Sequence, residues 1–243
     1  MFFLETKKHR IIAMICFCFA MEKEAAPLLE ECTILEQKKS GFAEMSLCQK
    51  GKITFVALVS GIGKGFACSG LTSALLLYKI DRVVNAGVAG SLDGARAPIL
   101  SCVVSSSLVQ HDMDTSAIGD PKGLLSGINV VDLPADKKLG DALVKAANEV
   151  GIPCAFGKIS SGDTFFKPDD SKKKEAIETF HPLVIDMESA CFAQIAYVFH
   201  VPYCSLRVIT DCDHPETEYA ANVDEASRRV KLILEEYLKE AEA

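Results

Sequence analysis

The sequence predicts an α/β fold in a single domain, and three features of the chain support this prediction. The chain has 243 residues, 49% of them hydrophobic, which is enough for one sizeable core. Short apolar runs alternate with longer helical patterns, and glycine turns or carboxylates follow several of the runs, as at the strand ends of α/β proteins. No linker-like stretch interrupts this order. We therefore expect one domain over residues 1–243, with residues 1–9 as a flexible extension.

Apolar or alternating segments predict the strands. They are residues 10–20, 33–39, 42–50, 53–59, 81–85, 99–105, 155–161, 183–185 and 203–210. The segments between residues 33 and 59 are separated by Gly41 and Gly51 and indicate a small antiparallel meander. Helical patterns begin near Glu24 and cover residues 66–78, 135–150, 189–200 and 221–237. Glycine turns are expected at residues 60–65 and 86–90, and an irregular stretch at residues 110–133.

The charge balance argues against nucleic acid and anionic membranes as partners. The formal net charge is −7 and the pI is near 5.3. The basic clusters at residues 7–10 and 172–174 are short, and such runs are usually solvated. A small molecule is therefore the expected ligand.

The cysteines indicate a reducing compartment. The ten cysteines are scattered through apolar segments, which is typical of free, buried thiols, and none has the spacing of a zinc site. Residues 7–20 resemble the charged and apolar regions of a secretory signal, which leaves secretion as an alternative. Acidic residues follow at once, however, and cleavage after Ala20 would remove the first strand. We expect a cytoplasmic protein.

The glycine turn at residues 60–65 matches neither common nucleotide motif. A P-loop needs Gly where the chain has Leu58 and Ser or Thr where it has Gly65. A dinucleotide fingerprint needs a third Gly where the chain has Phe66. We expect the glycines to allow backbone amides to approach a small ligand, and no cofactor is expected.

Acidic and aromatic residues follow the later strands. Asp186 and Glu188 lie where residues 183–185 give way to a helical pattern, and Asp211 ends the last strand. Carboxylates at strand ends can bind hydroxyl groups or perform acid–base chemistry, although Glu188 could simply cap its helix. Phe165 and Phe166 could form a platform for a flat ring or anchor their loop in the core.

The irregular stretch from residue 110 to 133 is longer than most loops that only connect two elements, and loops of this length are usually functional or disordered. His111, Asp112 and Asp114 could bind a metal, but a turn rich in Asp needs no ion, and no metal site is expected.

A family resemblance covers nearly the whole chain from Arg10 onward. It is carried by AMEKE (20–24), SGIGK (60–64), NAGVAGS (85–91), SGDTFF (161–166), DMESA (186–190) and RVITD (207–211). With these motifs in this order, the chain resembles the 5′-methylthioadenosine/S-adenosylhomocysteine nucleosidases of the nucleoside phosphorylase superfamily. The resemblance implies a three-layer α/β/α domain with a central mixed, twisted sheet. It also implies hydrolysis of an N-ribosidic bond in adenine nucleosides and a role in methionine salvage.

The resemblance also implies roles for single residues. Glu24 matches the carboxylate that activates water, and Asp211 matches the acid that protonates adenine at N7. Glu188 would take the ribose hydroxyls, Met187 would lie beneath the sugar and Arg207 would hold the carboxylates in register.

The remaining implied contacts surround the base and the 5′ tail. Phe165 would stack on adenine while the backbone of Phe166 reads its edge, and Met21 and Ile62 would line the site toward the alkylthio group. Further residues expected in the substrate site are Ala89, Gly90 and Thr210. In the resembling family a loop corresponding to residues 111–123 crosses a two-fold axis. A homodimer is therefore expected, with Ile118 covering the neighbour's tail pocket, unless Ile118 packs inside its own subunit.

The sequence departs from the family pattern at several positions. Val88 replaces a common Ser, which removes a hydroxyl near the ribose. Asp186 replaces Glu, Thr210 replaces Ser and Phe166 replaces an aliphatic residue. Val88 could alter the rate or the preference among methylthioadenosine, S-adenosylhomocysteine, deoxyadenosine and aminofutalosine-like substrates, which the sequence does not rank.

Two alternative functions share this fold. A phosphorylase of this fold needs cations to bind phosphate, typically one Arg at the end of the third sheet strand and another after the first strand. This chain instead has Asn85 at the first of these positions and the acidic residues 21–24 at the second, and acidic side chains repel phosphate. A nucleoside-binding protein without turnover predicts a missing acid or base, but Glu24, Glu188, Arg207 and Asp211 are all present.

Overall fold

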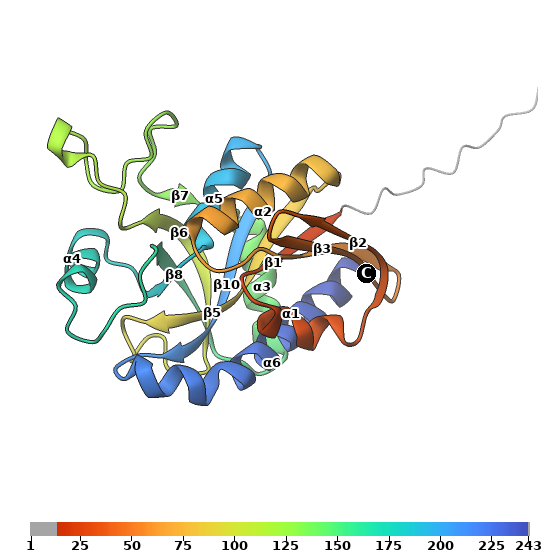
Figure 1. Cartoon of the computed structure of the whole chain (residues 1–243). Helices are drawn as coiled ribbons and strands as arrows, with labels where there is room; N and C mark the ends of the chain where they lie inside the picture. Colours follow the sequence, from red (N-terminus) through yellow and green to blue (C-terminus); the bar gives the residue numbers. More distant parts are fainter. Residues whose placement is uncertain (1–13, 243) are drawn as a thin grey trace, which may run out of the picture.

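A computed structural model describes residues 14–242, which form one ten-stranded sheet with helices on both faces (Figure 1). The strands are β1 (Ile15–Phe19), β2 (Thr33–Ser40), β3 (Ala43–Lys50), β4 (Ile53–Val59), β5 (Arg82–Ser91), β6 (Cys102–Gln110), β7 (Leu133–Pro134), β8 (Cys154–Ser161), β9 (Val184–Asp186) and β10 (Tyr203–Asp211). The helices are α1 (Glu22–Leu29), α2 (Lys64–Leu77), α3 (Lys137–Glu149), α4 (Ser171–Phe180), α5 (Ser189–Val198) and α6 (Pro215–Glu242), with a 3₁₀ turn η1 (Ser116–Ile118). The expected extension at residues 1–9, the basic cluster at 7–10 and the start of the first predicted strand lie outside the described residues.

The sheet is mixed, as the family resemblance implies. Nine of its strands follow the order β10-β6-β8-β9-β5-β1-β4-β3-β2, and the tenth, β7, pairs with β6. Central pairs such as β1–β4, β1–β5 and β5–β10 are parallel, while β2, β3 and β4 form the predicted antiparallel meander. Because β10 pairs with both β5 and β6, the strands β5, β10, β6, β8 and β9 form a closed circuit of pairings rather than an open edge.

Two apolar cores lie on opposite faces of the sheet. Ile15, Phe17 and Phe19 of β1 join the core that α1, α3 and α6 cover. Cys16 and Cys18, which point the other way, join the core beneath α2 and α5. This alternation follows from the two-residue period of a strand. The result is the three-layer arrangement visible in Figure 1.

Strand β5 differs from its prediction in a way that shapes the site. The sequence suggested that it ends at Asn85 in a glycine turn, but β5 continues to Ser91 because β10 and β9 pair with it along residues 86–91. The glycines instead allow neighbours to approach this strand closely. A Cβ on Gly87 would collide with Glu24 and Arg207, and one on Gly90 would lie 2.8 Å from Oδ2 of Asp211.

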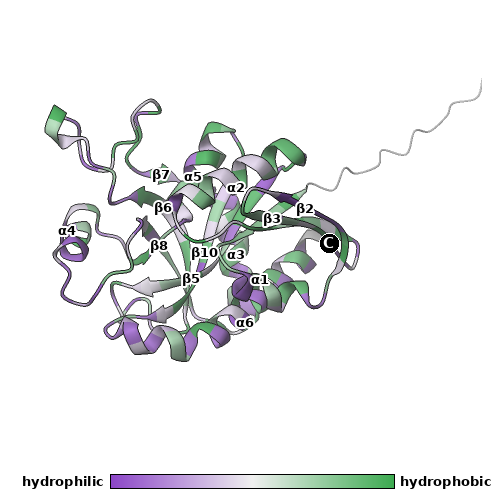
Figure 2. Ribbon diagram, viewed as in Figure 1, coloured by the Kyte–Doolittle hydropathy of each residue, from purple (hydrophilic) through white to green (hydrophobic). Residues whose placement is uncertain are grey.

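Two further predictions need correction. Strand β6 spans Cys102–Gln110 rather than residues 99–105, because its polar middle stays paired through a register shift between Ser105 and Ser107. Residues 171–180 form helix α4, capped by Asp170, whose side chain accepts a hydrogen bond from Lys172 N at 2.8 Å. The sequence indicates only a basic cluster at residues 172–174 and does not predict this helix. Figure 2 shows α4 as largely hydrophilic.

The stretch between β6 and β7 is irregular as predicted, apart from η1 and one isolated bridge between Leu125 and Val130. It projects from the body of the molecule, in yellow-green at the upper left of Figure 1. Within residues 14–242, every helix is too short or too polar to cross a lipid bilayer.

Candidate active site

A cavity of about 430 Å³ lies at the carboxyl ends of β1, β5, β9 and β10. Most residues that the sequence predicted for the site line it. They are Met21, Glu24, Ile62, Ala89, Gly90, Phe165, Phe166, Met187, Glu188, Thr210 and Asp211. Arg207 and Ile118 do not line it. Strand ends therefore do bring these distant segments together, as expected for an α/β sheet.

Glu24 lies in the first turn of α1 and is 3% exposed. Its Oε2 accepts hydrogen bonds from the backbone N–H groups of Ala20 and Met21, both at 3.0 Å, and its Oε1 accepts one from Val88 at 2.9 Å. Burial raises the pKa of the Glu24 carboxyl, and the charge of Arg207 and these three N–H groups oppose the rise. The carboxylate is thus fixed in orientation between α1 and β5.

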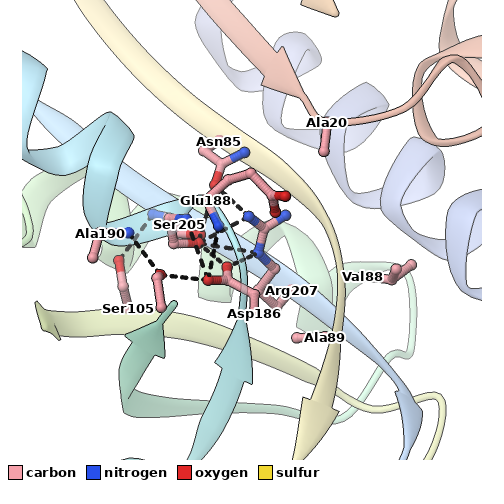
Figure 3. A network of polar contacts seen from close by, with 12 residues as sticks. Ala20, Asn85, Val88, Ala89, Ser105, Asp186, Glu188, Ala190, Ser205 and Arg207 are labelled. Carbon is pink, nitrogen blue, oxygen red and sulfur yellow. Dashed lines mark hydrogen bonds and ion pairs between the residues drawn. The ribbon is translucent and has the colours of Figure 1, made fainter. Parts of the chain in front are cut away.

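Arg207 lies behind the cavity wall and is completely buried. Its Nε lies 2.7 Å from Oδ2 of Asp186, and its Nη2 donates to Asn85 Oδ1 at 2.5 Å and to Ser189 Oγ at 2.9 Å. Figure 3 shows these contacts converging on Arg207 and Asp186. A buried ion pair is tolerated only with such additional hydrogen bonds. The network therefore fixes Asp186, which lines the cavity, while Arg207 itself does not reach the cavity.

Asn85 belongs to the same network and not to the cavity. Its Nδ2 donates to Cys18 O at 2.9 Å, and its side chain is fully buried. The expectation that Asn85 ends its strand is wrong, because β5 extends beyond it to Ser91. The β5 residues that reach the cavity are Val88, Ala89, Gly90 and Ser91.

Glu188 precedes α5 and is 6% exposed. Its Oε1 accepts a hydrogen bond from Gly63 N at 2.8 Å. The side chain makes no cap to its own helix, so the alternative of a simple helix cap is wrong; Asp186 Oδ1 instead accepts from the Glu188 and Ser189 amides at 3.3 Å. Burial and the adjacent charge of Asp186 raise the pKa of Glu188 to about 8.

Asp211 ends β10 beside Gly90 and is 6% exposed. Its Oδ1 accepts a hydrogen bond from Thr210 Oγ1 at 2.7 Å. Burial raises the pKa of the Asp211 carboxyl; the Thr210 bond lowers it, Glu218 adds to the rise and Lys173 opposes it. A carboxyl in this environment favours its protonated form more than an exposed aspartate does.

The two adjacent phenylalanines differ. Phe165 is 57% exposed and meets the Tyr219 ring edge-on, with centroids 5.9 Å apart, whereas Phe166 is 7% exposed and packs on His111 at 5.4 Å. Phe166 is buried because the loop after β8 turns its ring inward, as expected for an anchor of the loop. Both residues line the cavity. Phe165 presents an exposed ring, as the platform alternative requires, and Phe166 anchors the loop in the core.

Sequence reasoning missed some lining residues. Tyr219 lies in the first turns of α6, and Lys173 lies in the unpredicted helix α4. Neither follows a strand, so strand-end reasoning gave no signal for them. Lys173 is the only basic side chain among the lining residues of the described chain.

Ile118 lies in η1 and is 81% exposed. The alternative that it packs inside its own subunit is therefore wrong. The two aspartates that were weighed as metal ligands are bound by groups of the protein. Asp112 pairs with Lys64, and Asp114 accepts a hydrogen bond from Ser116 N. Across residues 14–242 no group of three or more His, Cys, Asp or Glu side chains is arranged to hold a metal ion.

Comparison with known proteins identifies related chains. The family model described as the phosphorylase superfamily matches residues 14–239. A 5′-methylthioadenosine/S-adenosylhomocysteine nucleosidase from Geobacillus thermodenitrificans is 34% identical over 200 residues, which cover 79% of this chain and 81% of the relative. One from Haemophilus influenzae is 37% identical over 167 residues, covering 67% and 71% of the two chains.

Solved structures resemble the fold closely. The futalosine hydrolase of Helicobacter pylori matches with a TM-score of 0.88 at 27% identity, covering 94% of this chain and 98% of that one. The 5′-methylthioadenosine/S-adenosylhomocysteine nucleosidase from Helicobacter pylori with butyl-thio-DADMe-Immucillin-A also has a TM-score of 0.88 at 27% identity, covering 95% and 99%.

Proposed function

Because the chain belongs to the phosphorylase superfamily, and within it to the 5′-methylthioadenosine/S-adenosylhomocysteine nucleosidases, we propose that it hydrolyses the N-ribosidic bond of both nucleosides. The products are adenine and the 5′-thio-substituted ribose. The observation that carries the proposal is that Glu24, Glu188 and Asp211 line one cavity with apolar walls around them.

Glu24 is the residue that activates water. Cleavage of an N-ribosidic bond passes through an oxocarbenium-like state, and water must attack the face of the sugar opposite the base. Three backbone N–H groups orient the Glu24 carboxylate, so it can accept a proton from a water on the cavity side. The resulting oxygen nucleophile adds to the anomeric carbon.

Asp211 is the acid that protonates adenine at N7 as the bond breaks. Adenine is a poor leaving group as an anion, and protonation makes it neutral on departure. The raised pKa of Asp211 favours the protonated form that this role requires. Phe165 stacks on the leaving base, and the backbone of Phe166 reads its edge.

Glu188 and Met187 hold the ribose. Gly63 N fixes one oxygen of Glu188, which leaves the other available to the sugar hydroxyls. Arg207 acts as a positioning residue: it pairs with Asp186, whose Oδ1 accepts the Glu188 amide. Val88, at the place of a common Ser, binds the substrate only through apolar contact.

Phosphorolysis fits this cavity poorly. A phosphate dianion needs cations, but Lys173 is the sole basic lining residue of the described chain and acts on Asp211, at the base. The carboxylate of Glu24 would repel the anion on the ribose side, and the other acidic lining residues offer phosphate no positive charge. A binding protein without turnover is disfavoured because acid and base are both in place.

A homodimer completes the proposal. Ile118 exposes 81% of its surface at the tip of a projecting loop, which is unusual for a large apolar side chain without a partner. In a two-fold dimer this loop covers the 5′-tail end of the neighbour's cavity, and the contact repeats on both sides. Ten free cysteines support a reducing cytoplasm, where the reaction serves methionine salvage.

Adenine release from four nucleosides tests the proposal. The purified protein is incubated with methylthioadenosine, S-adenosylhomocysteine, 5′-deoxyadenosine and aminofutalosine, and adenine is quantified by chromatography. We expect adenine from the first two at least, and the ratio of kcat/KM values ranks all four. Tight binding of these nucleosides without any release of adenine would instead identify a binding protein.

A further inference from the structure

The turn between β4 and α2 binds a carboxylate from each of two cavity walls. Gly63 N donates to Glu188 Oε1 at 2.8 Å, and the next amide, Lys64 N, donates to Asp163 Oδ1 at 2.8 Å. Amides at a helix N-terminus have no partner within the helix and lie at the positive end of its dipole. Asp163 immediately precedes residues 164–166, which line the cavity. The start of α2 therefore joins the proposed ribose site to the proposed base site.

The side chain of Lys64 extends this connection to the segment after β6. Its Nζ lies 2.7 Å from Asp112 Oδ1, and Asp112 Oδ2 accepts from Asp163 N at 3.1 Å. The Lys64 and Asp112 side chains are only 22% and 31% exposed, so solvent screens their ion pair less than a surface pair. Burial raises the pKa of Asp112, but the bonds from Lys64 and Asp163 outweigh it and hold the pKa below its usual value.

Asp112 binds the segment of residues 162–166, which belongs to neither a helix nor a strand. The backbone of residues 162–166 instead packs tightly on the segment after β6. A Cβ on Gly162 would lie 3.1 Å from Asp112 Cγ and would collide with the His111 ring. His111 pairs with Ser160 Oγ at 2.8 Å and packs against Phe166. The conformation of this segment thus depends on side chains from elsewhere in the chain.

We propose that Lys64 and Asp112 are positioning residues that fix residues 162–166, and with them the Phe165–Phe166 wall, relative to Glu188. Neither residue lines the cavity. The inference rests on the proposed function, in which this wall binds adenine. Without the Lys64–Asp112 ion pair, the substrate must order residues 162–166 when it binds. The entropy lost in that ordering lowers the affinity for the substrate. Glu24 and Asp211 lie on other elements, so the loss falls on KM and base affinity rather than on kcat.

Steady-state kinetics and adenine binding test this role. Lys64→Met should raise KM for methylthioadenosine and Kd for adenine by about tenfold while kcat changes by less than about threefold, the pattern of lost uniform binding. Lys64→Arg, which keeps the charge, should restore most of the affinity. The matched control is Lys158→Met, since Lys158 is 24% exposed, pairs with Asp132 at 2.9 Å and lies outside the cavity. The control should behave as wild type.

Hydrogen exchange supplies a readout that needs no ligand. The Asp163 amide is protected by Asp112, so the peptide covering residues 162–166 should exchange about tenfold faster in Lys64→Met and at the wild-type rate in Lys158→Met. Unchanged exchange would overturn the positioning role, and faster exchange with unchanged adenine affinity would overturn its link to base binding. A wild-type protein that releases no adenine would overturn the proposed function instead, while exchange still decides the positioning.

Discussion

Asp211 and Glu24 are both buried carboxyl groups, but their hydrogen-bond partners differ. Glu24 accepts from three backbone N–H groups, which favour the ionised form, whereas Asp211 accepts one bond from a hydroxyl and lies near Glu218. Different environments of this kind separate an acid from a base within one site. The proposed roles depend on that difference.

Replacement of Asp211 by Asn should separate binding from chemistry. The amide keeps the size of the side chain but cannot deliver a proton, so kcat should fall at least about 100-fold while the nucleoside still binds, because general acid catalysis contributes about that much. Rapid-quench kinetics with methylthioadenosine, together with calorimetric binding, measures both quantities. A kcat equal to that of the wild type would exclude Asp211 as the acid.

Glu188 predicts a pH dependence of stability. Its pKa is raised to about 8 in the folded protein from an ordinary value of 4.5, so the folded state binds more protons between these values. The free energy of unfolding should therefore fall as the pH rises from 5 to 8, by at most about 1.4 kcal/mol per pH unit from this group. Burial raises the pKa values of Glu24 and Asp211 as well, and both act in the same direction.

Urea denaturation at pH 5 and pH 8 measures this effect in the wild type and in Glu188→Gln. Glutamine cannot ionise, so the variant should lose less stability over the interval than the wild type. Equal losses in the two proteins would show that Glu188 has an ordinary pKa in the folded state.

At the scale of elements, strand β5 connects the fold to the site. It pairs with β1, β9 and β10 and passes close to Glu24, Arg207 and Asp211 at its glycines. Such an approach is possible only where no Cβ intervenes. The glycine-rich sequence of residues 86–90 therefore serves packing within a strand and not a turn.

Gly87→Ala should damage both stability and activity. The added Cβ would collide with the Glu24 carboxylate and the Arg207 guanidinium, and overpacking of this kind costs roughly 1–3 kcal/mol. We expect a lower Tm and a drop in kcat of at least about tenfold, since Glu24 must move. Gly65→Ala is the control, because apart from its chain neighbours and the backbone of α2 no atom lies within 4 Å of its Cβ position. Wild-type kcat in Gly87→Ala would contradict the close packing.

The sequence predicted the elements whose pattern is local. The alternation in β1, the meander of β2 to β4 and the buried helices α2 and α5 all follow from apolar period and glycine position. The extension of β5 and the closing pair β5–β10 depend on partners far along the chain, which no local pattern reveals. Helix α4 was missed because its hydrophilic residues leave only Ala176 and Phe180 buried.

The same distinction applies to the site. Residues that follow strands, such as Glu188 and Asp211, could be placed from the sequence because strand ends converge at one side of a sheet. Tyr219 and Lys173 reach the cavity from helices whose orientation depends on tertiary packing. The position of Arg207 behind the wall, rather than in it, likewise depends on the burial of its ion pair with Asp186.

At the scale of the whole molecule, the projecting loop predicts how subunits share a site. Ile118→Asp places a charge on the surface that the proposed dimer buries, which should weaken both dimerisation and affinity for substrates with long 5′ substituents. Light scattering and the KM for S-adenosylhomocysteine measure the two effects. If the variant stayed dimeric and bound this nucleoside as the wild type does, the shared pocket would be wrong.

The nature of the nucleophile is the central question for the whole molecule. Several acidic residues line the cavity, and Lys173 is its one basic lining residue within residues 14–242. Under the proposed function, water rather than phosphate should therefore attack the anomeric carbon. Incubation with methylthioadenosine in ¹⁸O-labelled water, with and without added phosphate, tests this most directly. We predict equal rates of adenine release and ¹⁸O at the anomeric carbon of methylthioribose in both. A rate that depends strictly on phosphate, with a ribose 1-phosphate as the product, would contradict the account.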